Sequence, residues 1–279
     1  MSSNIRIVPD SSADLNELEG VELVSVPLKI LAGPDTWVDD ESLDTGSMLD
    51  KLAEWKGRSS SSCPSPEEYL QAFGDAERII CVPISQNMSG SYNSCCVAAN
   101  DYMEQHPGRK VHVIDTLLAS APMHLVCEKL AEMIRAGEDY DTIVEKIDAE
   151  TKRTRLLFCL QSVRSLANNG RLSHAVAALV GMLNIRMIAR ASVKGEAEML
   201  AKARGDKKAV ASMVEQMKNL GFDGGRVIIH HVRNLPFAQS LADAIRGIWP
   251  GADISMQLCR GLCSYYGEDG GLLMGFQVN

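Results

Sequence analysis

The chain has 279 residues, a length that fits one large or two modest domains. Its composition, 46% hydrophobic and 23% charged, is that of a globular protein and excludes intrinsic disorder. The formal net charge of −8 argues against binding to nucleic acid or to an anionic membrane through bulk charge. No apolar run approaches the roughly 20 residues that span a bilayer, and the first residues are polar. We therefore expect a cytoplasmic protein without stable membrane insertion.

The first half of the chain alternates between strand and helix patterns. Strands are predicted at 5–8, 21–30, 79–84 and 111–114, and helices at 44–55, 93–103, 119–136 and 139–151. A serine-rich loop is predicted at 57–66, followed by a helix that begins near Glu67. Such alternation is typical of a parallel α/β sheet. The polar stretch 152–155 marks a junction, so we predict an N-terminal α/β domain over residues 1–155.

The second half is less regular and predicts an α+β domain over residues 156–279. Strands are predicted at 156–160, 184–189, 196–203, 227–231, 254–258 and 272–278, with a helical segment that ends at 168–170 and a helix at 207–220. The segment 175–183 is small and apolar.

The eight cysteines are predicted to be reduced and mostly packing residues. Cys81 and Cys159 interrupt apolar strand-like runs, where a thiol behaves as a small hydrophobic side chain. Cys259 and Cys263 lack the paired spacing of a zinc site, and adjacent histidines at 230–231 would point to opposite sides of a strand. We therefore expect no metal and no cofactor.

Basic side chains gather in the segment 152–208, which holds twelve Lys and Arg residues but only three Asp and Glu residues. Two interpretations are open. The charges form a dispersed, solvated face, or they make the chain a protein-interaction module that binds an acidic partner.

Three hydroxyl-rich segments, 10–12, 59–65 and 85–91, lie where strands or loops give way to helices. In open α/β sheets ligands bind beyond the carboxyl ends of the strands, and helix N-termini with nearby hydroxyls favour an anion. A carboxylate or phosphate site is therefore expected, although helix capping explains each segment taken alone. An interior with 13 methionines would also accept a flexible hydrocarbon.

A serine-dependent acyl hydrolase or transferase is the alternative from the enzyme class. Its nucleophile would be Ser89 or Ser62, with His112 and His124 as the nearest candidate bases. The residues around Ser89 lack the first glycine of a G-x-S-x-G elbow. Neither G-x-x-x-x-G-K-[ST] nor G-x-G-x-x-G after a strand occurs, which argues against ATP binding by this chain alone.

Six short motifs, in the same order along the chain, resemble those of the DegV family of fatty-acid-binding proteins. They are IVPDSSADL at 7–15 (family T-D-S-T-A-D-L), VPL at 26–28, SSCPS at 61–65 (T-S-Q-P-S), SQNMSGSYNS at 85–94 (S-S-x-L-S-G-T-Y-Q-S), NGRLS at 169–173 (G-G-R-I-S) and LNIRMI at 183–188 (L-N-I-K-P-I). The resemblance runs essentially from end to end.

The resemblance implies a two-domain DegV-like fold that encloses a long-chain fatty acid between its domains. Hydroxyls of Ser61 and Ser89 would hold the carboxylate, and Arg171 would lie near the head group. It also implies that such proteins present the fatty acid to a separate kinase subunit, which phosphorylates the carboxylate. The chain would then be a lipid carrier and a non-catalytic subunit, with a fatty acid as its ligand.

The chain departs from the family pattern near its C-terminus, where the family's H-T-G-P-G-A aligns with residues 265–270. Tyr265 stands in the place of the histidine, and Glu268 and Asp269 replace Pro and Gly. A tyrosine is neutral near pH 7 and cannot supply the cationic form of histidine. The added carboxylates would oppose an incoming phosphate, so fatty-acid binding is better supported than kinase partnership.

Overall fold

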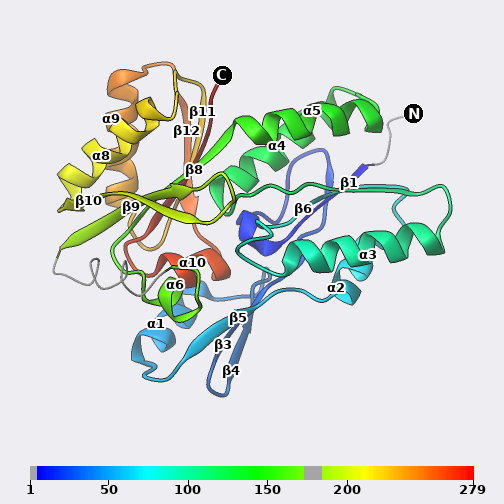
Figure 1. Ribbon diagram of the computed structural model, residues 1–279, viewed down its shortest axis with the longest axis horizontal. Coiled ribbons are helices and arrows are strands. Elements are labelled where there is room, and N and C mark those ends of the chain that lie inside the picture. Colours follow the sequence, from blue (N-terminus) through cyan, green and yellow to red (C-terminus); the bar gives the residue numbers. More distant parts are fainter. Residues whose placement is uncertain (1–4, 173–183) are drawn as a thin grey trace.

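The computed structural model describes residues 5–172 and 184–279. The apolar segment 175–183 lies outside the described residues. The chain forms two α/β units that lie side by side, with a smaller sheet below them (Figure 1).

The N-terminal unit contains four parallel strands, as the alternating pattern predicts. In sheet order they are β2 (Glu22–Leu23), β1 (Ile5–Pro9), β6 (Arg78–Val82) and β7 (Lys110–Val113). Helices α2 (Pro66–Phe73) and α3 (Ser91–Gln105) cover one face, and α4 (Ala121–Arg135) and α5 (Tyr140–Arg153) cover the other. Because side chains alternate along a strand, Val8 packs on the first helix pair and Ile7 on the second.

The C-terminal unit is a mixed six-stranded sheet. In sheet order its strands are β10 (Ala197–Arg204), β9 (Ile185–Ala191), β8 (Thr154–Leu160), β13 (Leu272–Gln277), β11 (Arg226–His231) and β12 (Asp253–Leu258). Helices α8 (Asp206–Asn219) and α9 (Leu235–Ile248) cover its outer face. Strand β8 begins at Thr154, so the predicted division after residue 155 falls inside this strand and stays a prediction.

A third, antiparallel sheet is formed by β4 (Asp35–Val38), β3 (Lys29–Ala32) and β5 (Ser59–Ser62). Close to it lie α1 (Thr45–Glu54), α6 (Arg164–Asn168) and α10 (Gly261–Gly267) (Figure 1). A short 3-10 turn, η1 (Ser11–Ala13), follows β1.

Two predictions about this third sheet are wrong. The single strand expected at 21–30 is divided into β2 and β3, because the chain leaves the parallel sheet between them and joins the small one. The serine-rich loop expected at 57–66 contains strand β5, whose serines pair with β3 from Lys29 to Ala32. Serine has little strand preference of its own, so pairing with β3 decides the conformation.

Helix α4 is shared by the two units and forms the centre of the main core. Met123, Val126 and Leu130 on this helix pack in one cluster with residues of β1, β6, β8 and β9. The helix approaches β13 at Gly275, where a Cβ atom would lie only 2.4 Å from the backbone nitrogen of Pro122. The close contact between helix and sheet therefore requires glycine at this position.

A buried polar chain also joins the units. Asp14 is fully buried at the end of η1, and its carboxylate lies 2.9 Å from Nδ1 of the equally buried His230 on β11. Nε2 of His230 lies 3.3 Å from Nδ1 of His124 on α4. The last member of this series of polar side chains is Glu128, which lies 3.7 Å from His124 and accepts two hydrogen bonds from Arg226.

The contact at Gly275 predicts that Gly275→Ala destabilises the protein. The added methyl meets backbone atoms, which can give way only if α4 moves, and overpacking of this kind costs about 1–3 kcal/mol. Gly247→Ala in α9 is the matched control, because its Cβ meets no atom within 4 Å. Urea denaturation should show a loss for the first variant and no loss for the second; equal stabilities would contradict this helix–sheet contact.

The buried histidines of this polar series predict lower stability of the protein in acid. Burial, reinforced by the charge of His230, lowers the pKa of His124 from 6.5 to about 4. Between pH 6.5 and about 4, His124 is therefore protonated in the unfolded protein but not in the folded one. The free energy of unfolding should fall as the pH drops through this range. Burial alone would raise the pKa of Asp14, but His230 lowers it, so the contribution of Asp14 is lost only below about pH 3.8. Denaturation at several pH values should give a shallower slope for His124→Gln; parallel slopes would refute the assignment.

Candidate functional site

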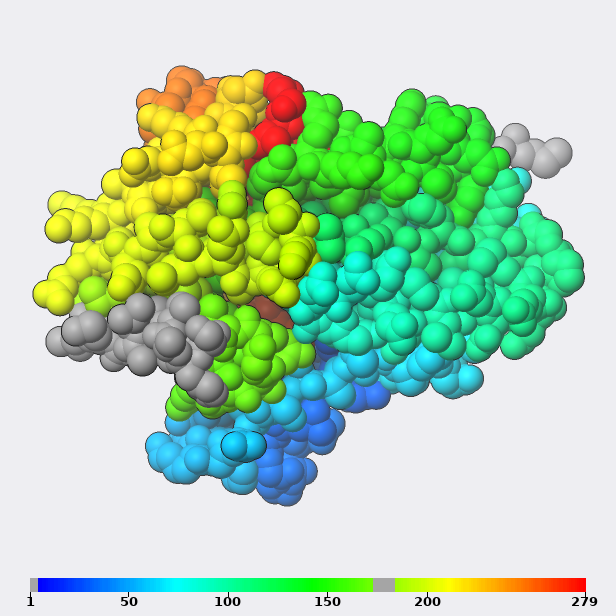
Figure 2. All heavy atoms as spheres, in the orientation of Figure 1, coloured from blue at the N-terminus to red at the C-terminus, as the bar shows by residue number. Residues whose placement is uncertain are grey.

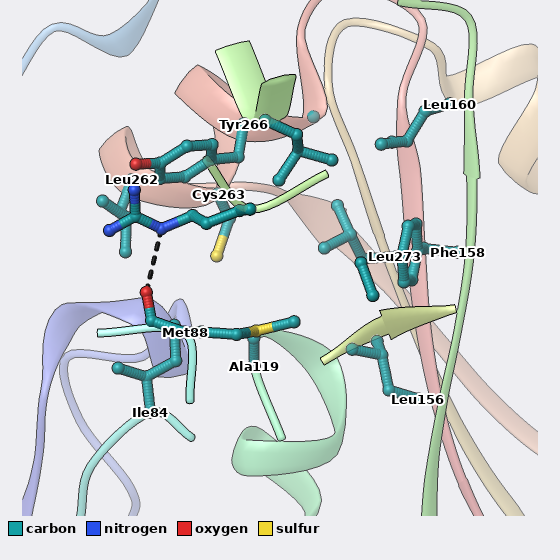
Figure 3. A pocket seen from close by; sticks show the side chains of 14 residues that line it. Ile84, Met88, Ala119, Leu156, Phe158, Leu160, Leu262, Cys263, Tyr266 and Leu273 are labelled. Carbon is teal, nitrogen blue, oxygen red and sulfur yellow. Dashed lines mark hydrogen bonds between the residues drawn. The ribbon is translucent and has the colours of Figure 1, made fainter. Parts of the chain in front are cut away.

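An apolar pocket lies between the two units. Fourteen residues line it: Ile84, Met88, Ala119, Leu156, Phe158, Leu160, Leu166, Arg171, Ala197, Leu262, Cys263, Tyr266, Gly267 and Leu273 (Figure 3). Alternation along β8 explains three of them, because Leu156, Phe158 and Leu160 face the pocket while the side chains between them face α8 and α9. In Figure 2 the surface is hollowed between the cyan-green and the yellow-green segments, and red-brown atoms of the C-terminal part of the chain show at its base.

The cavity inside this lining has a volume of about 70 Å³. A long hydrocarbon chain has to move side chains in order to enter it. Met88 is half-buried and unbranched, and methionine is the side chain that adapts most readily to a new neighbour.

Polar groups gather at one end of the pocket. The hydroxyl oxygens of Ser61 on β5 and Tyr266 on α10 lie 2.7 Å apart. The guanidinium of Arg171 lies over the Tyr266 ring, 5.1 Å from its centre. Arg171 also donates from Nε to the Met88 carbonyl oxygen at 2.9 Å, the bond drawn in Figure 3. These contacts place one cation and two hydroxyls beside an apolar cavity.

The loop that carries Ser89 reaches the same place. A Cβ atom on Gly90 would lie 3.0 Å from Sγ of Cys63, so this loop touches the segment that follows β5. Ser89 itself is half-buried and accepts a hydrogen bond from the amide of Ser91 at 3.3 Å. The structure thus brings the segments of all three predicted site residues together around one end of the pocket.

The fully buried carboxylate of Asp10 holds these loops in position. It accepts four hydrogen bonds, from the amide and hydroxyl of Ser12, the amide of Ile84 and the hydroxyl of Ser91. Burial raises the pKa of the Asp10 carboxyl, and the four bonds oppose that rise. The hydroxyl-rich segments at 10–12 and 85–91 are therefore fixed to one another through this side chain.

A second buried carboxylate, Asp39, positions α10. It accepts hydrogen bonds from the amides of Gly261 and Leu262 at 2.7 and 2.9 Å, at the N-terminus of that helix. Burial raises the pKa of Asp39 to about 6, although the bond from Leu262 and the charge of Arg260 lower it. The favourable interaction of a carboxylate with a helix N-terminus orients the helix that carries Tyr266.

The sequence reasoning missed Tyr266 and singled out its neighbour Tyr265. The Tyr265 side chain is buried outside the apolar pocket, with its hydroxyl 3.0 Å from Ser59 Oγ and 2.8 Å from the side-chain nitrogen Nδ2 of Asn169. The short helix α10 was not predicted. Its signal was the spacing of Leu262, Cys263 and Tyr266, which a helix places on one face toward the pocket.

The two added carboxylates of this region have partners of their own. Glu268 accepts hydrogen bonds from the Ser162 hydroxyl and the Ser165 amide, at 2.7 and 2.8 Å. Asp269 lies 3.8 Å from the guanidinium of Arg233. Of the two carboxylates, Asp269 has a cation beside it that offsets part of its charge, whereas the partners of Glu268 are neutral.

The structure does not support the serine hydrolase alternative. Within residues 5–172 and 184–279 neither Ser62 nor Ser89 is hydrogen-bonded to a histidine ring, since His112 pairs with Asp148 and His124 with His230. Ser120 and Asp14 both contact Nδ1 of His230. A catalytic triad uses the two ring nitrogens separately, so this buried cluster does not have that geometry.

The remaining predictions concern metals, membranes and charge. Among the described residues no group of three or more His, Cys, Asp or Glu side chains could hold a metal ion. The helices of this same part of the chain are each too short or too polar to span a bilayer. The basic segment is partly neutralised, because Arg186 pairs with Asp206 and Arg190 with Glu198.

Comparison with known proteins agrees with this architecture. A family model described as an uncharacterised protein of the DegV family matches residues 4–269. A DegV domain-containing protein of Streptococcus pneumoniae (spr0652) is 42% identical over 278 residues, which are 98% of this chain and 99% of that protein.

Two solved structures are similar over almost the whole length. The fatty acid kinase B3 protein of Streptococcus pneumoniae, loaded with linoleic acid, has a TM-score of 0.97 and 42% identity and covers 99% of both chains. A DegV family protein from Eubacterium eligens, loaded with heptadecanoic acid, has a TM-score of 0.97 and 39% identity, and the match covers 99% of this chain and 100% of that one. The predicted resemblance and the two-unit α/β fold class are confirmed, and the chain belongs to the DegV family.

Proposed function

We propose that this protein is a cytoplasmic carrier of a long-chain fatty acid and has no catalytic activity of its own. The single observation that carries the proposal is an apolar pocket between the units with Arg171 and two hydroxyls at one end. In this proposal Ser61 and Ser89 supply hydroxyls to the head-group region, and Arg171 supplies the positive charge. The acyl-loaded relatives, named for heptadecanoic and linoleic acid, support it.

The two ends of the pocket suit the two ends of a fatty acid. Each methylene that leaves water contributes about 0.8 kcal/mol, so a long chain is held mainly by the apolar lining. A carboxylate that is buried without partners is costly, and hydrogen bonds to a charged group are among the stronger ones in proteins. In this proposal the hydroxyls of Ser61 and Ser89 and the guanidinium of Arg171 are the partners of the buried carboxylate.

We also propose that the carrier presents its fatty acid to a kinase subunit. The similar fatty acid kinase B3 protein supports this role, as does the lack of a nucleotide-binding motif in the sequence of this chain. Transfer of a phosphoryl group to the carboxylate would then need a catalytic partner. The eight cysteines, all free, fit a reducing compartment such as the cytoplasm.

Extraction of the purified protein tests the carrier function. Mass spectrometry should find a long-chain fatty acid in near-equimolar amount, because slow release keeps a buried acyl chain bound through purification. If the protein carries no lipid and takes up no added fatty acid, the proposed function is wrong.

The same measurement tests the head-group residues. The double variant Ser61→Ala and Ser89→Ala should retain at least tenfold less fatty acid, because two hydroxyls near the carboxylate are lost. Ser62→Ala is the matched control, since Ser62 is exposed on the opposite side of β5. Equal retention by the double variant and the control would exclude the assignment of Ser61 and Ser89.

Kinase presentation is tested by mixing the loaded protein with ATP and a bacterial fatty acid kinase catalytic subunit. Acyl phosphate should form only when all three components are present. Arg171→Gln should lower the rate, because it removes the positive charge near the carboxylate. If free fatty acid is phosphorylated as fast as the protein-bound form, the chain does not serve as the presenting subunit.

A further inference from the structure

The lining of the apolar pocket contains few polar side chains. Of its fourteen residues, Arg171 and Tyr266 carry a charged or hydroxyl group, and Cys263 carries a thiol. Ser61 and Ser89 are not part of this lining among the described residues. Among the described residues, Tyr266 therefore carries the hydroxyl group of this lining, and Ser61 is hydrogen-bonded to it.

The hydrogen bond between Ser61 and Tyr266 leaves one proton available. Each hydroxyl carries a single proton, and the two oxygens are 2.7 Å apart. When Ser61 donates to Tyr266, the phenol proton is free to point toward the pocket. A phenol is more acidic than an aliphatic hydroxyl and makes the stronger bond to a carboxylate. Burial raises the pKa of Tyr266, although Ser61 and Arg171 lower it, so the phenol keeps its proton at neutral pH.

The ring of Tyr266 is held from two sides. Arg171 covers one side, with its guanidinium carbon 5.1 Å from the ring centre, and that guanidinium is fixed by bonds to the carbonyls of Met88 and Asn169. The Tyr265 ring packs edge-on at 4.7 Å between centroids. An immobilised ring presents its hydroxyl in one direction, so little conformational freedom is lost when a ligand binds.

We propose that Tyr266 donates its hydroxyl proton directly to the fatty-acid carboxylate, and that Ser61 is a positioning residue that acts through Tyr266. This proposal rests on the proposed function; it makes Tyr266 the direct contact of the carboxylate and Ser61 an indirect one. Tyr265, which stands in the place of the family histidine, is already hydrogen-bonded to Ser59 and Asn169 and does not line the apolar pocket.

Affinity for hexadecanoate after lipid removal tests this order. Tyr266→Phe should bind hexadecanoate about 10- to 100-fold more weakly than the wild type, because a hydrogen bond to a charged group is lost. Tyr265→Phe is the matched control and should bind within about twofold of the wild type. Adding Ser61→Ala to Tyr266→Phe should weaken binding no further, because Ser61 has no carboxylate contact of its own.

Each other result overturns the proposal, and the failures can be told apart. If the wild type does not bind hexadecanoate, the proposed function itself fails. If the wild type binds and Tyr266→Phe matches it, or if Ser61→Ala adds its full effect to Tyr266→Phe, the carboxylate meets Ser61 directly. If Tyr265→Phe weakens binding as much as Tyr266→Phe, the loss comes from the packing of α10.

A measurement on the wild type keeps the proposal testable if a variant does not fold. Nitration of tyrosines by tetranitromethane can be located by tandem mass spectrometry, even at adjacent positions. Hexadecanoate should reduce nitration of Tyr266 several-fold and leave Tyr265, which is only 2% exposed, unchanged. Nitration of Tyr266 that is unaffected by hexadecanoate overturns the direct contact.

Discussion

The geometry of the apolar pocket and its polar end depends on the hydrogen bonds to the buried carboxylate of Asp10. This carboxylate stands at the carboxyl end of β1, and its four hydrogen bonds fix η1, the segment after β6 and the start of α3 relative to one another. A buried charge without these partners would be strongly unfavourable. The same bonds that make the carboxylate tolerable therefore also set the positions of Met88 and Ser89, which lie between Ile84 and Ser91.

The pocket belongs to the interface and to neither unit alone. Strand β8 supplies its wall from the C-terminal sheet, the loop after β6 supplies Met88 from the N-terminal sheet, and α10 closes one end. Helix α4 sets the spacing between the sheets, and the absence of a side chain at Gly275 allows that close spacing. Such an arrangement creates an apolar space without breaking the continuous core around it.

Local patterns predict most of the fold but little of the site. Apolar runs such as 79–84 identify buried strands because the residues that become buried are adjacent in the sequence and all apolar. Strand β5 and helix α10 were missed because their conformations depend on distant partners. The hydroxyl of Ser61 meets a residue 205 positions later in the chain, and no periodicity reports such a contact. Ser61, Ser89 and Arg171 came from a family resemblance, which carries spatial information that composition and spacing lack.

The charge balance at the polar end follows from these placements. Arg171 supplies a positive charge, and Tyr266, whose pKa is raised by burial, adds a neutral hydroxyl. The carboxylates of Glu268 and Asp269 interact with Ser162, Ser165 and Arg233, and neither residue lines the apolar pocket. In the proposed function, a carboxylate ligand would therefore meet one cation and neutral hydroxyl donors at this end of the pocket.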